Sequence, residues 1–287
     1  MSMLFDSPLH DVPRIGTSLK RRSSSEEYYS CSSTSKRQRV DSSLKLVSGS
    51  FYIPKDDDSK PEGEDAHFVC EEEQTIGVAD GVGGWAKYGI DAGEYARELM
   101  SNCELATKNE PRGCVDPQRV LNSAYSGTLG LGSSTACIIT LRNKSLHAVN
   151  VGDSGFRVFR RGEGCVYRSP VQQHQFNCPY QLGITKDHPS SAEVLEVPIE
   201  DGDVIIVGSD GLFDNVFDSE IEEMVNQGIT NGQKADEIAC TIADLALYNS
   251  FDRFRKTPFS MEARKARVQH CGGKIDDISV IVAFVVS

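Results

Sequence analysis

The feature that most constrains the fold is a series of short apolar runs, joined in pairs by turns too short to contain a helix. Three such pairs are predicted: residues 134–141 with 145–151, 156–160 with 165–168, and 193–199 with 204–208. Short turns join antiparallel neighbours, whereas parallel strands require a crossover of about a dozen or more residues. The pattern therefore predicts antiparallel sheets.

Amphipathic helices are predicted between and after these strands. Asp91 has the position of an N-cap before apolar residues at helical spacing, namely Ala96, Leu99, Met100 and Cys103. Asp116-Pro117 starts a second helix. Further helices are predicted around residues 219–227 and 234–249, and a last strand over 278–286. Because hairpins outnumber strand–helix–strand crossovers, we expect an α+β fold with helices packed outside antiparallel sheets.

The chain divides into a Ser-rich N-terminal tail, residues 1–45, and a folded domain, residues 46–287. The tail has few large apolar residues and no sustained period, so it cannot offset its ordering entropy by burial. We expect it to be disordered. The stretch from Pro170 to Ala192 is polar and lacks a period, which predicts a loop near a functional surface.

Two basic clusters in the tail, Lys20–Arg22 and Lys36–Arg39, are spaced like a bipartite nuclear localisation signal. A transit peptide is the alternative explanation. Transit peptides are poor in acidic residues, and the tail contains Asp6, Asp11, Glu26 and Glu27. The residues therefore favour the nucleus and cytoplasm over a plastid or mitochondrion.

Charge and cysteine content exclude several classes of protein. Residues 1–50 carry eight Lys or Arg and five Asp or Glu, which leaves 22 basic and 37 acidic residues, a net charge of −15, for residues 51–287. Such a surplus repels a nucleic-acid backbone and suits a cation, although an acidic surface can also serve solubility alone. The nine cysteines have no CxxC spacing, which argues against a disulfide framework or a zinc site. No apolar run approaches the about 20 residues of a membrane span.

Aspartates stand at the ends of apolar strands. Asp80 and Asp210 each follow such a strand and precede glycine, Asp153 follows residues 148–152, and Asp276-Asp277 introduces the last strand. Divalent cations such as Mg²⁺ require oxygen ligands held on rigid elements, and glycine lets the backbone approach an ion closely. Any single Asp-Gly is better explained as a common turn. The repeated strand-end placement, however, favours a two-metal site.

Six motifs in a fixed order carry a resemblance to a known family, the metal-dependent protein phosphatases of type 2C (PPM family). They are Glu64-Asp65-Ala66, Val78-Ala79-Asp80-Gly81-Val82-Gly83-Gly84, Gly132-Ser133-Ser134-Thr135-Ala136, Asn150-Val151-Gly152-Asp153-Ser154, Ser209-Asp210-Gly211-Leu212-Phe213-Asp214 and Asp276-Asp277-Ile278-Ser279-Val280. Each motif alone is weak, but the ordered set is specific. The variant ending in Trp85 resembles the branch found in organelle-associated and plant members.

The resemblance implies a four-layer α-β-β-α sandwich, with two antiparallel sheets flanked by helices and a metal site at one end. By matching motif, Asp80 would bridge two metals, Gly81 would supply a backbone carbonyl, and Asp210 and Asp276 would complete the site. Asp65 and Glu64 match a pair that acts on the metals directly or through water. Asp153 matches the aspartate of a weaker third metal.

The implied activity is hydrolysis of phosphoserine and phosphothreonine proteins by a water that two Mg²⁺ or Mn²⁺ ions activate, without a covalent intermediate. We expect a monomer with no nucleic-acid or membrane partner, although no residue pattern specifies the oligomeric state.

The sequence departs from the family at two positions. Lys60 stands where many members have an arginine that grips the phosphate, so the charge is kept but the bidentate fork is lost. Val82 stands where many have a histidine that protonates the leaving group. His67 and water are the available substitutes, and a core hydrogen bond is the simpler role for His67.

The sequence disfavours three alternative functions. Residues 81–86 also fit the Gly-x-Gly-x-x-Ala fingerprint of a dinucleotide oxidoreductase, but Asp80 would place negative charge beside the pyrophosphate. None of the cysteines opens a Cys-x5-Arg loop, which disfavours a cysteine-dependent phosphatase. An inactive family member that serves as a binding module is disfavoured by the complete set of carboxylates.

Overall fold

The computed structural model describes residues 43–185 and 187–287. The interpretation of the N-terminal tail and of its two basic clusters lies outside the described residues. Among the residues described, no helix is both long enough and apolar enough to cross a membrane.

The first of two five-stranded sheets contains both ends of the described chain. Its strands in spatial order are β1 (Lys45–Ile53), β14 (Ile278–Val286), β13 (Val204–Gly208), β7 (Gly155–Arg160) and β8 (Gly164–Arg168). All neighbours are antiparallel. The C-terminal strand β14 is therefore central, and its near-continuous apolar sequence fits burial on both faces.

The second sheet has five strands, also all antiparallel. In spatial order they are β12 (Glu193–Pro198), β6 (Ser145–Val151), β5 (Ala136–Arg142), β3 (Thr75–Asp80) and β2 (Asp65–Cys70). The predicted hairpins β5–β6 and β7–β8 are confirmed, one in each sheet.

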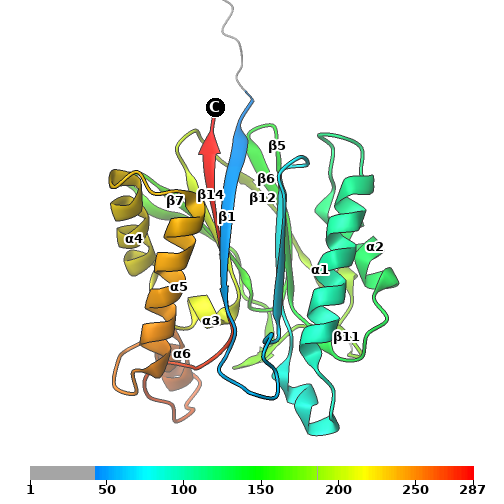
Figure 1. Ribbon diagram of the computed structural model, residues 1–287, viewed down its shortest axis with the longest axis vertical. Coiled ribbons are helices and arrows are strands. Elements are labelled where there is room, and N and C mark those ends of the chain that lie inside the picture. The colour runs from blue at the N-terminus through cyan, green and yellow to red at the C-terminus, as the bar shows by residue number, and fades with distance from the viewer. Residues whose placement is uncertain (1–42, 186) are drawn as a thin grey trace, which may run out of the picture. The chain divides into compact units, whose positions relative to one another are not determined.

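Helices cover the outer face of each sheet, as Figure 1 shows. The second sheet is covered by α1 (Ala92–Asn109) and α2 (Pro117–Gly127), and the first by α4 (Asp218–Thr230) and α5 (Ala235–Phe251). The predicted caps form: Asp91 accepts a hydrogen bond from the Gly93 amide and Asp116 from the Gln118 amide, both at 2.9 Å.

Strand alternation divides the apolar residues among three layers of core. On β13, Ile205 and Val207 face the second sheet, whereas Ile206 packs with Ile238 and Ile242 of α5. A third cluster joins the second sheet to α1 and α2. Two sheets packed face to face, each with helices outside, confirm the predicted four-layer α-β-β-α sandwich.

One predicted strand pair is wrong. Residues 193–199 and 204–208 do not form a hairpin, because β12 pairs with β6 of the second sheet and β13 pairs with β7 and β14 of the first. The turn between them does close locally, with the Asp203 amide donating to the Glu200 carbonyl at 3.1 Å. A tight turn therefore carries the chain from one sheet to the other, and the free edge of β6 decides where β12 pairs.

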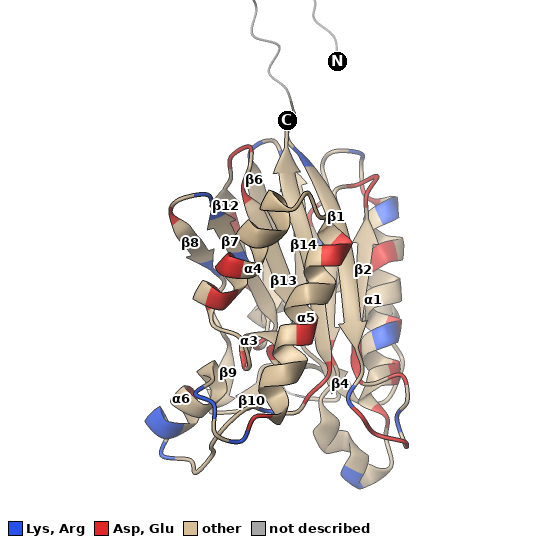
Figure 2. Ribbon diagram, turned by 60° about the vertical axis from the view of Figure 1, so that its left-hand side comes forward, with Lys and Arg blue, Asp and Glu red and all other residues tan. Residues whose placement is uncertain are grey.

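Shorter elements gather at one end of the sandwich. They are η1 (Gly83–Tyr88), β4 (Ser133–Ser134), β9 (Gln173–Gln175), β10 (Cys178–Pro179), β11 (Leu182–Gly183), η2 (Pro189–Ser191), α3 (Asp210–Phe213) and α6 (Pro258–Lys265). The segment predicted as a long loop contains β9, β10, β11 and η2. Figure 2 shows acidic residues beside α3 at this end. Helix α6 was not predicted from the sequence.

Candidate metal centre

Asp80 is the last residue of β3 and is held rigidly through its backbone. Its amide donates to Thr135 Oγ1 at 3.0 Å, and its carbonyl accepts from the Thr135 amide at 2.9 Å. The next residue must be glycine, because a Cβ on Gly81 would lie 2.6 Å from the Glu64 carbonyl oxygen and 2.7 Å from that of Ala92. The strand end therefore presents the Asp80 side chain at a fixed place.

Asp153 and Asp210 bring their carboxylates to the same place from two other elements. Asp153 follows β6, and Asp210 is the first residue of the short helix α3, directly after β13. One carboxylate oxygen from each of Asp80, Asp153 and Asp210 lies within 4.8 Å of the other two. The structure thus brings together three of the aspartates predicted to bind metal, from both sheets. The carboxylates of Asp80, Asp153 and Asp210 form the acidic cluster of the metal centre.

Two of these carboxylates each have one oxygen without a partner in the described part of the chain. Asp153 Oδ1 and Asp210 Oδ1 are buried and have no hydrogen-bond partner among the residues that the structure describes. A buried polar atom without a partner is costly unless a ligand satisfies it. Hard carboxylate oxygens that converge in this way form the donor set that Mg²⁺ or Mn²⁺ requires. The residues present therefore fit the predicted divalent cations.

The adjacent aspartates Asp276 and Asp277 have different surroundings. Asp277 accepts hydrogen bonds from Tyr52 Oη at 2.9 Å, the Lys55 amide at 2.9 Å and the Glu64 amide at 3.1 Å, so it ties β1 and the segment before β2 to β14. Asp276 Oδ2 instead lies 3.1 Å from the Lys274 ammonium, which also bonds Asp210, and burial followed by the charge of Asp210 raises the pKa of the Asp276 carboxyl. Of the pair, Asp276 is the one directed at the cluster.

Two residues of the centre were missed by the sequence analysis. Asp214 lies one helical turn after Asp210, and Lys274 lies two residues before Asp276. The Lys274 ammonium bonds the carboxylate of Asp210, and it lies 3.1 Å from Asp214 Oδ2 and 3.1 Å from Asp276 Oδ2. Asp214 could have been found by its i, i+4 spacing from Asp210 within a recognised motif, whereas Lys274 carried no such indication.

Burial and the charges of neighbouring carboxylates make Asp80 and Asp214 hard to ionise. Burial, followed by the charges of Asp210 and Asp65, raises the pKa of Asp80 well above its usual range. Burial also raises the pKa of Asp214 to about 7, although Lys274 opposes that shift. These carboxyls will bind a divalent cation more readily as the pH rises and their protons leave.

Glu64 and Asp65 lie where β2 meets the end of β3. Asp65 is opposite Asp80 in the register of the two strands. Burial, followed by the charge of Asp277, raises the pKa of Asp65 well above its usual range. Glu64 Oε1 pairs with Lys60 Nζ at 2.5 Å, so the Lys60 ammonium is held beside the Glu64-Asp65 pair.

Val82 occupies the position where many family members have the acidic histidine, and His67 is the nearby substitute that the sequence offers. Val82 follows Gly81, and its amide donates to the Ser133 carbonyl at 2.9 Å. His67 lies on β2, and its Nε2 is 3.0 Å from Ser50 Oγ on β1, while burial lowers the pKa of its imidazole. His67 therefore makes a hydrogen bond between the sheets, as the simpler interpretation proposed.

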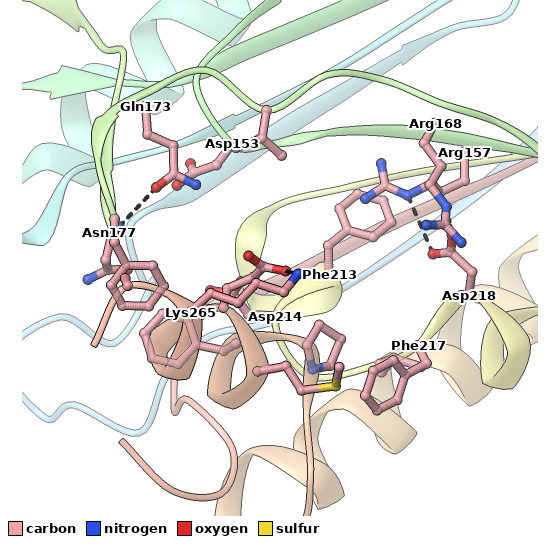
Figure 3. A pocket seen from close by; sticks show the side chains of 18 residues that line it. Asp153, Arg157, Arg168, Gln173, Asn177, Phe213, Asp214, Phe217, Asp218 and Lys265 are labelled. Atoms are coloured by element: carbon pink, nitrogen blue, oxygen red, sulfur yellow. Dashed lines mark hydrogen bonds and ion pairs between the residues drawn. The ribbon is translucent and has the colours of Figure 1, made fainter. Parts of the chain in front are cut away.

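A pocket of about 570 Å³ opens beside the cluster (Figure 3). Asp153 and Asp214 line one side of it. At another side Arg157 and Arg168 both pair with Asp218, which leaves one net positive charge there. The wall between is aromatic and apolar, formed by Phe176, Phe213, Phe217, Phe259 and Met261.

Sequence comparison identifies several phosphatases as relatives. No protein-family model matches the chain. It is 54% identical over 244 residues to "Probable protein phosphatase 2C 55" of Arabidopsis thaliana, covering 84% of the chain and 52% of that protein. It is 39% identical over 273 residues to "Protein phosphatase PTC7 homolog fig" of Drosophila virilis, and the match covers 87% of the chain and 83% of that protein. The chain thus spans about half the length of the first relative.

Structural comparison agrees with these relatives. The X-ray structure of the photosystem II phosphatase PBCP superposes with a TM-score of 0.77 and 36% identity, over 83% of this chain and 98% of that one. The catalytic domain of the phosphatase PstP, solved with two manganese ions, superposes with a TM-score of 0.61, and at 19% identity it supports the fold alone. Three observations agree: the 39% identity across most of one relative, the six ordered motifs and the four-layer sandwich. The chain therefore belongs to the protein phosphatase 2C family of metal-dependent serine/threonine phosphatases.

Proposed function

We propose that this chain is a protein serine/threonine phosphatase that hydrolyses phosphomonoesters with two Mg²⁺ or Mn²⁺ ions and no covalent intermediate. The observation that carries the proposal is the convergence of Asp80, Asp153 and Asp210 from three elements, with buried oxygens that lack partners in the described part of the chain. Carboxylates without a cation would repel the phosphate, so activity requires the metal.

The residues have separate roles in this proposal. Asp80 would serve both ions, Gly81 would offer its backbone carbonyl, and Asp210 and Asp276 would complete the ligand set. Glu64 and Asp65 would act directly or through water, and Asp153 would contribute from the segment after β6. The bound ions supply a water of lowered pKa and electrostatic stabilisation of the phosphoryl group.

Lys60 is proposed to steady the phosphoryl oxygens. Its ammonium has three N–H donors, and the contact with Glu64 leaves donors for an anion. A lysine offers a point charge and not a bidentate fork, so its grip on phosphate is less directional than that of arginine. Because His67 is engaged with Ser50, we propose that water protonates the leaving alkoxide.

The pocket beside the cluster is proposed to receive the polypeptide around the phosphorylated residue. It adjoins Asp153 and Asp214 directly, and its aromatic wall can bury a substrate side chain. The positive charge shared by Arg157, Arg168 and Asp218 suits an acidic group near the phosphosite.

The test is release of phosphate from phosphoserine and phosphothreonine peptides, with Mn²⁺ and with excess chelator. We expect turnover only with the metal, and loss of turnover in Asp80→Asn. Asp201→Asn is the matched control, because Asp201 also precedes a glycine but lies exposed in a turn. Full activity in excess chelator, or a phosphorylated residue trapped during turnover, would contradict the proposal.

A further inference from the structure

A basic pocket of about 670 Å³ is formed by residues 254–272, a single excursion of the chain between α5 and β14. Four of its lining residues are basic, namely Arg255, Lys256, Arg264 and Arg267, and none of the described residues that line it is acidic. Residues 253–271 contain six Lys or Arg and one Glu, a net charge of +5, whereas the whole chain has a net charge of −12. The basic pocket is therefore an exception on an acidic protein.

Most of these cations are not neutralised within the protein. Arg255 forms an ion pair with Glu220. Lys256, Arg264 and Arg267 are exposed and have no ion pair among the described residues. Like charges that are gathered without counter-charges create a positive potential that attracts an anionic partner.

The basic pocket is preformed, because hydrogen bonds close the excursion at its base. The Gly273 amide donates to the Asp252 carbonyl at 2.9 Å, and Thr257 Oγ1 donates to the Gly272 carbonyl at 2.9 Å. Thr257 Oγ1 also accepts from the Ser260 amide at 3.2 Å, which caps α6. These bonds hold the residues before and after α6 together, so a partner does not have to order the segment on binding.

Helix α6 is the wall between the basic pocket and the pocket beside the cluster, and it lies at the same end of the sandwich as α3 (Figure 2). Glu262 and Lys265, three positions apart, line the pocket beside the cluster. Ser260 and Arg264, four positions apart, line the basic pocket, and Met261 contributes to both. Residues three or four positions apart share a helix face, so the two pockets lie against different faces of one helix.

The basic pocket also lies close to the metal centre. His270, which lines it, packs edge-on against Phe259 with ring centres 4.7 Å apart. The centre of the Phe259 ring in turn lies 5.3 Å from the Lys274 ammonium, which bonds Asp210. A polypeptide that passes α6 must cover about the width of a helix, about 10–12 Å, which an extended chain spans in about three to five residues.

We infer that the basic pocket is a docking site for an acidic segment of the protein substrate, about three to five residues from the phosphorylated residue. The inference rests on the proposed function and adds a second point of contact with the same polypeptide. Carboxylates of the segment complement the unpaired cations. A nucleic acid or a membrane would extend beyond the pocket onto the rest of the chain, whose acidic surplus repels it, whereas a short acidic segment would not.

The first experiment compares two phosphothreonine peptides as substrates of the full chain with Mn²⁺. One has a run of glutamates about four residues from the phosphothreonine, placed before it or after it in separate peptides, and the other has glutamines in the same places. For at least one placement we expect KM of the glutamate peptide to be about 10-fold lower with kcat unchanged, the scale of a few exposed ion pairs. Added salt should reduce the difference. Equal KM values for both placements would overturn the inference.

Matched variants locate the effect. Lys256→Gln/Arg264→Gln removes two exposed cations of the basic pocket and should abolish the difference in KM, without a change in urea denaturation. Arg112→Gln/Arg161→Gln removes two exposed cations from turns outside this segment and should keep the difference. p-Nitrophenyl phosphate is too small to reach the basic pocket, so its hydrolysis should be equal in all three proteins. An equal loss of the difference in both variants would assign it to net charge and overturn the inference.

Binding measured without turnover separates this inference from the proposed function. A labelled glutamate peptide without phosphate is titrated with the metal-free protein and followed by fluorescence anisotropy, and Lys256→Gln/Arg264→Gln should weaken its binding about 10-fold. Vesicles of phosphatidylcholine and phosphatidylserine and a single-stranded RNA are tested beside it, because Phe254, 97% exposed at the basic pocket, would also suit a lipid surface. Tighter binding of vesicles or RNA than of the peptide would overturn the inference. Absence of phosphopeptide hydrolysis with Mn²⁺, with peptide binding intact, would instead refute the proposed function.

Discussion

The two ends of β13 carry buried aspartates whose surroundings differ completely. Asp203, just before the strand, is 1% exposed, and each of its oxygens is bonded: Arg160 Nε and Nη2 each donate at 2.8 Å, and the Glu200 amide donates at 2.8 Å. Asp210, just after the strand, is 8% exposed and has one oxygen without a partner in the described structure. At the start of β13 the buried carboxylate is fully hydrogen-bonded in an ion pair, whereas at its end one carboxylate oxygen has no partner among the described residues.

The difference distinguishes a carboxylate that holds the fold together from one that is kept for a ligand. A bidentate arginine pair offsets the cost of burying Asp203 within the protein. At Asp210 that cost is offset only in part, by Lys274, and the remaining oxygen requires a cation. Burial alone therefore does not identify a functional aspartate, whereas burial with an unsatisfied oxygen beside other carboxylates does.

The largest effect on activity is expected at the second end of β13. Asp210→Asn removes a negative ligand from the centre, so turnover of a phosphopeptide should fall by about 10³-fold or more. The unfolding free energy of the metal-free protein should change by no more than about 1 kcal/mol, since Asp210 is both repelled by carboxylates and attracted by Lys274. Steady-state kinetics and urea denaturation measure the two effects. A large loss of stability with little loss of activity would show that Asp210 holds the fold together and is not kept for a ligand.

The largest effect on stability is expected at the first end. Asp203→Asn leaves the Arg160 guanidinium paired only with the exposed Glu200, at 3.1 Å, and this should lower the unfolding free energy by about 1–3 kcal/mol. Urea denaturation in the presence of chelator measures this loss. Activity per folded molecule should stay near that of the wild type, and so should Mn²⁺ affinity. Weakened metal binding in Asp203→Asn would show that the two ends of β13 are not independent.

Substitution of Lys60 compares the loss of a proposed phosphate contact with the loss of a metal ligand. Lys60→Ala should lower kcat/KM by about 10²-fold, less than Asp210→Asn, because a phosphate contact is lost while the metal ligands remain. Lys60→Arg should keep most of the activity that Lys60→Ala loses, because arginine preserves the positive charge and supplies a bidentate fork. Mn²⁺ titration of Lys60→Ala serves as the control and should match the wild type. Equal losses for Lys60→Ala and Asp210→Asn would mean that Lys60 is as essential as a ligand.

A smaller effect is expected in the pocket beside the centre. Arg168→Ala should raise KM for a phosphopeptide with an acidic residue near the phosphosite by about 10-fold or less, the range of a partly exposed charge. KM for p-nitrophenyl phosphate, which has no peptide, should not change. Kinetics with both substrates make the comparison. An equal change in both would place Arg168 at the reaction and not in peptide recognition.

The smallest effect is expected on the pH dependence of stability, through His67. Like Asp203, His67 has its hydrogen-bond partner inside the protein, in this case Ser50. Burial lowers the pKa of its imidazole, so the folded protein binds fewer protons here than the unfolded chain below pH about 6.5. Stability at this position is therefore lost as the pH falls through that range. His67→Gln should reduce the loss between pH 7.5 and 5.5 by about 1 kcal/mol or less, measured by urea denaturation. Identical pH profiles would contradict it.

The sequence by itself determined the features that depend on neighbours along the chain. The caps at Asp91 and Asp116, the hairpins β5–β6 and β7–β8, and the strand-end position of Asp80 all follow from local periodicity and turn chemistry. The motif series extended this to the four-layer sandwich, because a resemblance carries information on packing that periodicity does not.

Only the tertiary structure decided which residues meet. β12 leaves its sequence neighbour β13 for the edge of β6, because a tight turn fixes where the chain goes but not which edge is free. Local chemistry does not distinguish Asp276 from Asp277, and only the matching motif selected Asp276; in the structure Asp276 contacts Lys274, whereas Asp277 accepts a hydrogen bond from Tyr52. Lys274 reaches Asp210 across 64 positions of sequence. Electrostatic contacts act through space, so a pattern read along the chain cannot specify them.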